Sequence, residues 1–412
     1  MQVSMTRREL GSLALGAPLA AASGAASAAP AAETLNDALR RSMESNGIPG
    51  VVAFAADRNR VLYYGAFGLA DIAIKRPMTE DALFRIASMT KPIASIAAMQ
   101  LVEQKRFGLD DPVERYLPEF AELQVFDSFD SATGAYRLRP ATKSVTVRQL
   151  LTHTSGIGYN FTSPILRDFK PRDGERYAVG PLLFDPGERW HYGTSTDWVG
   201  RLVEVASGQS LDSYFRERIF APLKMADTHY SIPPEKQSRL VAVHRRQPDG
   251  SMGKEATQPP VTLRTMVGST GLTSTASDYI RFARMMLNGG ELDGVHIVST
   301  ETIAEMSRTQ IGDLTASALK TAMPDRSNDF SFIADGRDKW GLGFLIAAAE
   351  TPGGPSAGSL SWGGINNTYF WVDRSRGIAG VILMQFLPFA DAKALALYDT
   401  FQRGVYRLAD ST

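Results

Sequence analysis

The chain has 412 residues, with 44 basic and 44 acidic side chains, so its formal net charge is zero. This balance favours neither nucleic acid nor an anionic membrane surface as a partner, while 44% hydrophobic and 21% charged residues are typical of a folded globular protein. The absence of cysteine excludes thiol nucleophiles, thiolate metal sites and disulfides.

The first residues have the composition of an export signal. Arg7 and Arg8 precede the small, apolar run GSLALGAPLAAASGAASA, and residues 26–28 read Ala-Ser-Ala, the form of a cleavage site. Twin arginines before a weakly hydrophobic core favour the Tat route. We therefore expect residues 1–28 to be a signal peptide and the protein to be periplasmic or secreted; the alternative is a cytoplasmic protein with an alanine-rich tail. No later stretch predicts a membrane span.

The elements that follow predict one sheet built from both ends of the chain. Helical spacing over 33–46 is followed by GVVAFAAD and VLYYGAFG, which flank a turn and predict a β-hairpin. A long apolar helix is predicted from near Ser88 to near Gly108, and then helices and proline-rich loops to about residue 290.

After residue 338 the pattern changes to short β-rich runs separated by turns, and the amphipathic run AKALALYDTFQRGVYRL predicts a last helix. The simplest assembly is an α+β fold in which an antiparallel β-sheet is flanked by helices and interrupted by an all-helical insert. The expected division is an α/β domain over 29–108 and 291–412, with a helical domain over 109–290.

Few motifs in the sequence carry chemistry. The five histidines have no metal-ligand spacing, and no phosphate-binding GKS or GKT loop occurs. We therefore expect no metal and no cofactor. The remaining candidate is Ser-x-x-Lys.

This pattern occurs three times, at Ser88/Lys91, Ser251/Lys254 and Ser317/Lys320. The second pair lies in a polar loop, and no apolar helix follows the third. The first stands where a long buried helix begins, so that its two residues share a face and free backbone N–H groups can stabilise an oxyanion. Pro92 disfavours helical geometry at Lys91, although a first turn tolerates proline. From geometry alone, an N-cap serine beside a solvated lysine stays an open alternative.

Five motifs occur in order along the chain: FRIASMTKPI, LLTHTSG, FDPGERWHYGTS, GSTGLTSTASDYIRF and SWGGINN. In order and spacing they resemble the penicillin-recognising serine hydrolase superfamily, in its class C β-lactamase-like branch, and within that branch the family VIII carboxylesterases. The resemblance covers nearly the whole mature chain. It implies a β-lactamase/transpeptidase-like fold, with the active site in the cleft between the α/β and helical domains.

The resemblance also implies catalytic roles. Ser88 matches the nucleophile, Lys91 its activating partner, and Tyr192 the tyrosine of a Tyr-x-Asn motif. A serine hydroxyl needs a base, and an ammonium lowers the pKa of a nearby phenol from about 10, so either partner can take the first proton. The implied oxyanion donors are the backbone N–H groups of Ser88 and Ile365.

Two departures from the family pattern concern the substrate. Trp362, Gly363 and Gly364 stand where β-lactamases usually have Lys-Thr-Gly, and Thr194 replaces the asparagine. An indole offers an apolar face and one N–H donor but cannot neutralise a carboxylate, and threonine lacks the two-sided hydrogen bonding of an amide. Trp-Gly-Gly is the form seen in family VIII esterases, and both changes favour uncharged, partly apolar esters. Trp362 is expected in the cleft wall.

Two histidines lie beside these motifs, and we expect neither in a Ser-His triad. His153 is predicted to pack or to cap a turn, and His191 to lie behind the site or at the surface. The predicted activity is hydrolysis of neutral small or medium acyl esters through an acyl-enzyme on Ser88, with a small-molecule ester as partner. The alternatives are an amide or peptide hydrolase of the same fold, including β-lactamase or D-amino-acid peptidase activity, and a catalytically silent binding protein.

Overall fold

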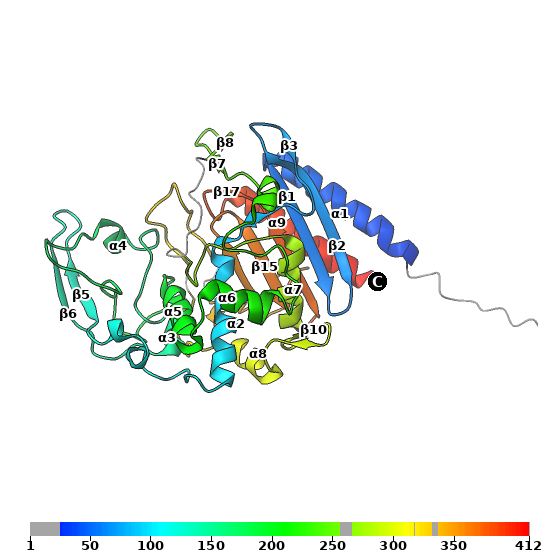
Figure 1. Ribbon diagram of the computed structural model, residues 1–412. Coiled ribbons are helices and arrows are strands. Elements are labelled where there is room, and N and C mark those ends of the chain that lie inside the picture. Colours follow the sequence, from blue (N-terminus) through cyan, green and yellow to red (C-terminus); the bar gives the residue numbers. More distant parts are fainter. Residues whose placement is uncertain (1–24, 256–265, 317, 332–336, 412) are drawn as a thin grey trace, which may run out of the picture.

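The computed structural model describes residues 25–255, 266–316, 318–331 and 337–411 (Figure 1). Residues 1–24 of the expected export signal, which spans 1–28, lie outside the described residues, and helix α1 (Ala25–Ser45) includes its last four residues. None of the helices in these ranges combines the length and the apolar composition that a membrane crossing requires.

An eight-stranded sheet forms the centre of the molecule, in the order β12-β13-β14-β15-β16-β1-β2-β3. All its pairs are antiparallel, and β1 joins β16 with Val52 opposite Leu383. The predicted assembly of N-terminal hairpin and C-terminal strands is confirmed. The strands are β1 (Gly50–Asp57), β2 (Val61–Asp71), β3 (Arg76–Pro77), β12 (Lys339–Trp340), β13 (Leu345–Ile346), β14 (Leu360–Gly364), β15 (Thr368–Asp373) and β16 (Ile378–Leu383).

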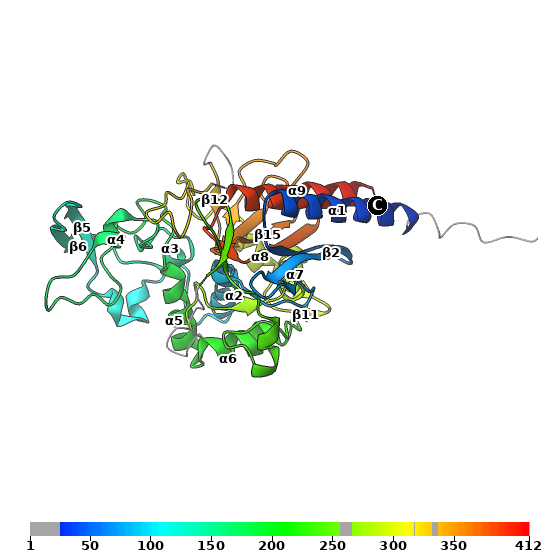
Figure 2. The same cartoon turned by 90° about the horizontal axis from the view of Figure 1, so that it is seen from above.

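Helices cover both faces of this sheet (Figure 2). On one face α1 packs against α9 (Ala392–Asp410), whose buried residues recur at helical spacing and whose N-terminus is capped by the Asp391 carboxylate. On the other face lie α2 (Thr90–Glu103) and α7 (Ala276–Leu287). Although α7 falls within the range predicted for the helical domain, it packs on β1, β15 and β16.

The predicted long helix is shorter than expected. It consists of a 3-10 turn, η1 (Ala87–Met89), followed by α2, which ends five residues before Gly108. Pro92 is the third residue of α2, where the backbone N–H has no intrahelical partner to lose. Proline at this position is therefore compatible with a helix that contains Lys91. Twelve consecutive residues of α2, from Thr90 to Leu101, are buried, which makes it the central helix of the core.

The insert is not all-helical, and in this detail the prediction was wrong. It contains a hairpin of β5 (Gln124–Phe129) and β6 (Tyr136–Pro140), at the left of Figure 1. Only Val125 and Phe126 of β5 are buried, so the strand has no long apolar alternation for sequence analysis to detect. Asp130 closes the turn by accepting the N–H of Ala132.

The other elements are shorter. The helices are α3 (Val147–Leu151), α4 (Pro164–Asp168), α5 (Ser195–Ser207), α6 (Leu211–Phe215) and α8 (Thr300–Met306), with 3-10 turns η2 (Val113–Arg115), η3 (Pro118–Phe120) and η5 (Pro234–Arg239) and a π-turn η4 (Arg216–Phe220). The strands are β4 (Phe84–Arg85) with β9 (Thr273–Ser274), β7 (His244–Arg246) with β8 (Met252–Lys254) and β17 (Phe386–Leu387), and β10 (Glu291–Leu292) with β11 (Val295–His296).

Candidate active site

Ser88 lies in η1, between the short strand β4 and the central helix α2. The preceding residue, Ala87, is buried and has a φ of 45°, in the left-handed region that residues with a Cβ rarely adopt. Strained backbone of this kind concentrates at functional sites. The turn leaves the Ser88 side chain half-buried at the entrance to the helix.

Lys91 is only 1% exposed, and its ammonium nitrogen uses three hydrogen bonds. It donates to Ser88 Oγ at 3.2 Å, to the Tyr159 hydroxyl at 3.0 Å and to the Ser269 carbonyl oxygen at 3.1 Å. Burial lowers the pKa of Lys91 to about 7, and the nearby Asp197 carboxylate opposes this shift. At neutral pH a large fraction of Lys91 is therefore unprotonated and able to accept the Ser88 proton.

Tyr192 is 3% exposed, and its ring centre lies 5.3 Å from that of Tyr159. Its hydroxyl accepts a hydrogen bond from Trp362 Nε1 at 3.2 Å, and Lys91 Nζ lies 4.8 Å from the centre of its ring. Burial raises the pKa of Tyr192, against the lowering effect of hydrogen bonds to Ser88 and Trp362. The sequence-based expectation of a lowered phenol pKa is therefore wrong, because the loss of water outweighs the other contributions.

The indole of Trp362 packs against the ring of Tyr192. Its ring centre lies 4.8 Å from that of Tyr192 and 4.6 Å from that of Trp340, and only 4% of the residue is exposed. The side chain is therefore part of a packed aromatic cluster and presents little surface to a cleft. Thr194, half-buried, is the N-terminal cap residue of α5.

The two histidines have the supporting positions that the sequence predicts. His153 is buried, and its Nδ1 accepts the Gly193 N–H at 3.4 Å; burial holds the pKa of His153 well below 6.5, so it is neutral. His191 is half-buried with Nε2 at 3.2 Å from Thr162 Oγ1, and burial lowers its pKa to about 4. Neither ring forms a hydrogen bond to Ser88 within the part of the chain that the structure describes.

The end of β14 approaches the nucleophile turn closely. A Cβ on Gly364 would lie 2.3 Å from the backbone oxygen of Ile86, and a Cβ on Gly363 would lie 2.9 Å from the Tyr369 ring, so only glycine fits at either position without a shift. Ile365 follows directly, half-buried. The two implied oxyanion donors, the N–H groups of Ser88 and Ile365, thus come from two segments in contact.

Three residues of the site were not predicted from the sequence. Tyr159 and Ser269 bind Lys91 directly, and Asp197 Oδ1 accepts the Ser269 N–H at 2.9 Å. Tyr159 follows LLTHTSG by three residues, and Ser269 lies inside a recognised motif. Their closeness to the motifs is the sequence feature that could have indicated a role in the site, but neither the spacing nor the resemblance assigned a role to these residues.

The other Ser-x-x-Lys pairs are not assembled. Ser251 Oγ donates to Asp249, while Lys254 forms an ion pair with Asp71, each at 2.7 Å. Ser317 lies outside the described residues, and Lys320 forms an ion pair with Asp329 at 2.6 Å. Only the first pair has the nucleophile and the lysine in hydrogen-bonding contact among the described residues.

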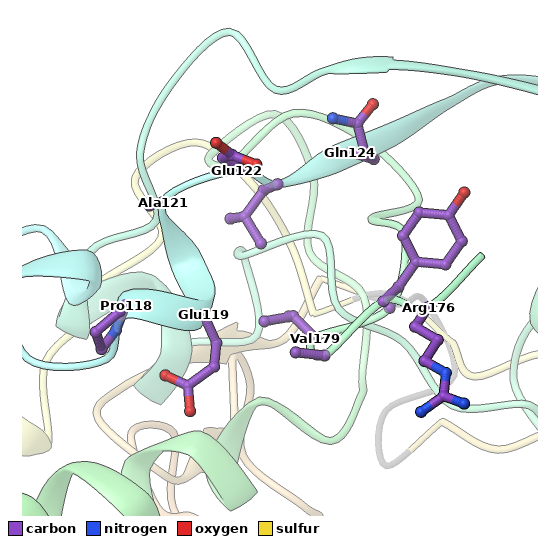
Figure 3. Close-up of a pocket in the computed structure, with 11 residues that line it drawn as sticks. Pro118, Glu119, Ala121, Glu122, Gln124, Arg176 and Val179 are labelled. Carbon is purple, nitrogen blue, oxygen red and sulfur yellow. The ribbon is translucent and has the colours of Figure 1, made fainter. Parts of the chain in front are cut away.

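A surface pocket of about 390 Å³ lies on the insert, between η3 and residues 176–180 (Figure 3). Glu119, Glu122 and Arg176 stand around it, and none of the residues at the Ser88 site lines it. The pocket therefore adds no group to the chemistry described above.

Comparison with known proteins gives consistent results. The family model described as Beta-lactamase matches residues 35–402. The chain is 30% identical over 410 residues to monacolin J acid methylbutanoyltransferase of Aspergillus terreus, covering 93% of this chain and 97% of that protein. It is 31% identical over 393 residues to esterase EstB of Burkholderia gladioli, covering 86% and 91%. The unliganded selenomethionyl structure of simvastatin synthase (LovD) from Aspergillus terreus matches with a TM-score of 0.78 at 28% identity, covering 91% and 98%.

Proposed function

Because this chain belongs to the beta-lactamase family of the penicillin-recognising serine hydrolases, we propose that it is a serine carboxylesterase acting on neutral small or medium acyl esters. The observation that carries the proposal is the hydrogen bond between Lys91 Nζ and Ser88 Oγ, formed by a lysine whose pKa burial lowers to about 7. A base with a pKa near the working pH is the most effective partner for a serine nucleophile.

Acylation then proceeds in balanced steps. Neutral Lys91 takes the Ser88 proton as the bond from Oγ to the ester carbon forms, and the N–H groups of Ser88 and Ile365 stabilise the oxyanion. When the ester C–O bond breaks, the departing alkoxide takes up the proton from the Lys91 ammonium, beside the Tyr192 hydroxyl that is hydrogen-bonded to Ser88. Water then attacks the acyl carbon and gives a proton to Lys91, the bond from that carbon to Ser88 Oγ breaks to release the acid, and Ser88 Oγ takes the proton back from Lys91.

Substrate preference follows from the strand residue that usually binds a carboxylate. Trp362 stands at that position and gives its one N–H to the Tyr192 hydroxyl, so it offers no positive charge to an anionic substrate. A hydrogen bond to a charged group contributes roughly 1.5–3 kcal/mol, which corresponds to about a ten- to a hundredfold disadvantage for an anionic β-lactam. Neutral esters lose nothing by this replacement.

Acyl transfer to an alcohol is a second candidate activity. The observation that favours it is the 30% identity, over 93% of this chain, to a protein named as a methylbutanoyltransferase. Such a reaction uses the same acyl-enzyme, with the alcohol oxygen in place of water as the attacking atom and Lys91 again receiving the proton. Hydrolysis and transfer then differ only in whether water or the alcohol attacks the acyl carbon of the Ser88 acyl-enzyme first.

The test compares kcat/KM for p-nitrophenyl butyrate and nitrocefin on the full chain, with and without a primary alcohol. We expect the ester to be better by at least about tenfold, and an ester product from the alcohol if transfer competes with hydrolysis. A better rate with nitrocefin would replace the esterase proposal by the amide-hydrolase alternative. No turnover together with no labelling by a phosphonate ester would leave the silent binding protein.

Export remains a separate proposal, because the twin arginines and most of the apolar run that suggest it lie outside the described ranges. A fusion of residues 1–40 to a Tat-dependent reporter should reach the periplasm, and replacing Arg7 and Arg8 by lysine should block it. Export that persists without both arginines would indicate the Sec route, and no export would indicate a cytoplasmic enzyme.

A further inference from the structure

We propose that Asp197 is a positioning residue that sets the pH range in which Lys91 can accept the proton of Ser88. This inference rests on the proposed function, because it assigns Lys91 the role of base. It adds a residue that neither the Ser-x-x-Lys motif nor the Tyr-x-Asn motif contains. Asp197 acts on Lys91 through Ser269, and its side chain forms no hydrogen bond to Ser88 or Lys91 among the described residues.

The geometry connects the two side chains through one residue. Asp197 lies in the first turn of α5, and its Oδ1 accepts the backbone N–H of Ser269 at 2.9 Å. The carbonyl oxygen of the same residue accepts Lys91 Nζ at 3.1 Å. The carboxylate thus fixes the backbone to which the lysine is bound, and it places a negative charge close to a buried ammonium.

The other titratable groups around Lys91 supply no charge. Burial raises the pKa values of Tyr159 and Tyr192 and keeps both phenols protonated, and burial keeps His153 neutral. Burial raises the pKa of the Asp197 carboxyl, while hydrogen bonds to Ser269 and the charge of Lys91 favour its ionised form. Within the described residues, ionised Asp197 is the group of opposite charge that acts on Lys91. Its attraction raises the pKa of Lys91 against the effect of burial, so the lysine stays basic enough to take a serine proton.

The substitution Asp197→Asn separates charge from structure. An asparagine carbonyl can still accept the Ser269 N–H, but the negative charge is gone. An opposite charge within about 4–6 Å moves a pKa by about 1–3 units. We expect the acid limb of the rate profile to move to lower pH by about one unit or more, and the plateau rate to fall because Lys91 becomes a weaker base.

Asp278→Asn is the matched control. Asp278 is buried, whereas Asp197 is half-buried, and burial raises the pKa of Asp278 to about 6. Its Oδ2 accepts from Asp227 N–H and Thr228 Oγ1, and within the described ranges it forms no hydrogen bond with Lys91. This variant should keep the acid limb of the unmodified protein. Asp197→Glu retains the charge and should also keep the acid limb of the rate profile in place. A purely structural role of Asp197 predicts a different pair of results: Asp197→Glu would lose rate, and Asp197→Asn would not move the acid limb.

The rate is measured on the full chain in two ways. One is kcat/KM for p-nitrophenyl butyrate against pH. The other is single-turnover labelling by a p-nitrophenyl phosphonate, in which the bond from Ser88 Oγ to phosphorus forms, the bond to nitrophenolate breaks, and Lys91 takes the hydroxyl proton. Labelling without ester turnover would refute the proposed function while still testing Asp197.

An acid limb that stays in place or moves to higher pH in Asp197→Asn would overturn the inference, and so would an equal movement in Asp278→Asn. If Asp197→Asn does not fold, Asp197→Ser serves as the second neutral variant and must shift the limb in the same direction. Tryptophan fluorescence of each variant verifies the fold before the rates are compared.

Discussion

Replacing Lys91 by methionine should abolish turnover and remove a pH-dependent cost from the folded state. Burial lowers the pKa of this lysine from 10.5 to about 7. The difference corresponds to roughly 5 kcal/mol between charged and neutral forms. Methionine fills a similar volume and has no charge to bury, so it lacks this cost at every pH.

The sign follows from proton binding. Between about pH 7 and about pH 10.5 the unfolded chain holds a proton on Lys91 that the folded chain has lost, so the stability of the unmodified protein rises with pH across this window. Below about pH 7 the full cost is present. The methionine variant has no such dependence, and its advantage over the unmodified protein should shrink by about 3 kcal/mol between about pH 7 and about pH 9.5.

Lost hydrogen bonds act in the opposite direction. Methionine leaves the Ser269 carbonyl and the Tyr159 hydroxyl without the lysine donor, at about 1–3 kcal/mol for each unsatisfied group. This loss changes the size of the difference in stability at any one pH but not its slope with pH. The slope is therefore the quantity to measure.

Urea unfolding of both proteins, followed by tryptophan fluorescence at several pH values, gives that slope. Lys393→Met, at an exposed position in α9, is the control and should differ from the unmodified protein by the same amount at every pH. A constant difference for Lys91→Met as well would refute the reasoning, because it would mean that Lys91 keeps its proton in the folded state.

Three further predictions concern activity. Ser88→Ala should abolish ester turnover and phosphonate labelling, whereas Ser251→Ala should keep both, as measured by kcat/KM and by mass spectrometry of the labelled chain. Tyr159→Phe removes a hydrogen bond from Lys91 and should lower kcat by about ten- to a hundredfold with little change in KM; an unchanged kcat would show that this tyrosine only packs. Gly364→Ala would place a Cβ 2.3 Å from a backbone oxygen of the nucleophile turn, so we expect a loss of at least about tenfold in kcat/KM, and full activity would contradict the close approach.

Sequence analysis predicted the parts of the fold whose signal is local. The hairpin β1–β2 and helix α9 follow from alternation and helical spacing of apolar residues, and both are present. The hairpin β5–β6 was missed because polar residues interrupt its apolar pattern. The shortened α2 shows that apolar composition alone does not fix where a helix ends.

The site divides in the same way. Ser88 and Lys91 are three residues apart on one chain segment, so spacing alone can nominate them. Tyr192 required the family resemblance, and Tyr159 and Asp197 were found only from the structure. Their contacts with Lys91 and Ser269 join distant segments, and the lowered pKa of Lys91 depends on burial that no local pattern encodes.

The pairing of β1 with β16 has a consequence for biosynthesis. Val52 meets Leu383 across the sheet, so a growing chain presents the open edge of β1 until residues 378–383 have been made. Such an edge can pair with another molecule, and contacts between distant residues form slowly. Release of a chain that stops before Ile378 should therefore yield aggregates, and correct folding depends on keeping that edge covered until β16 has been made.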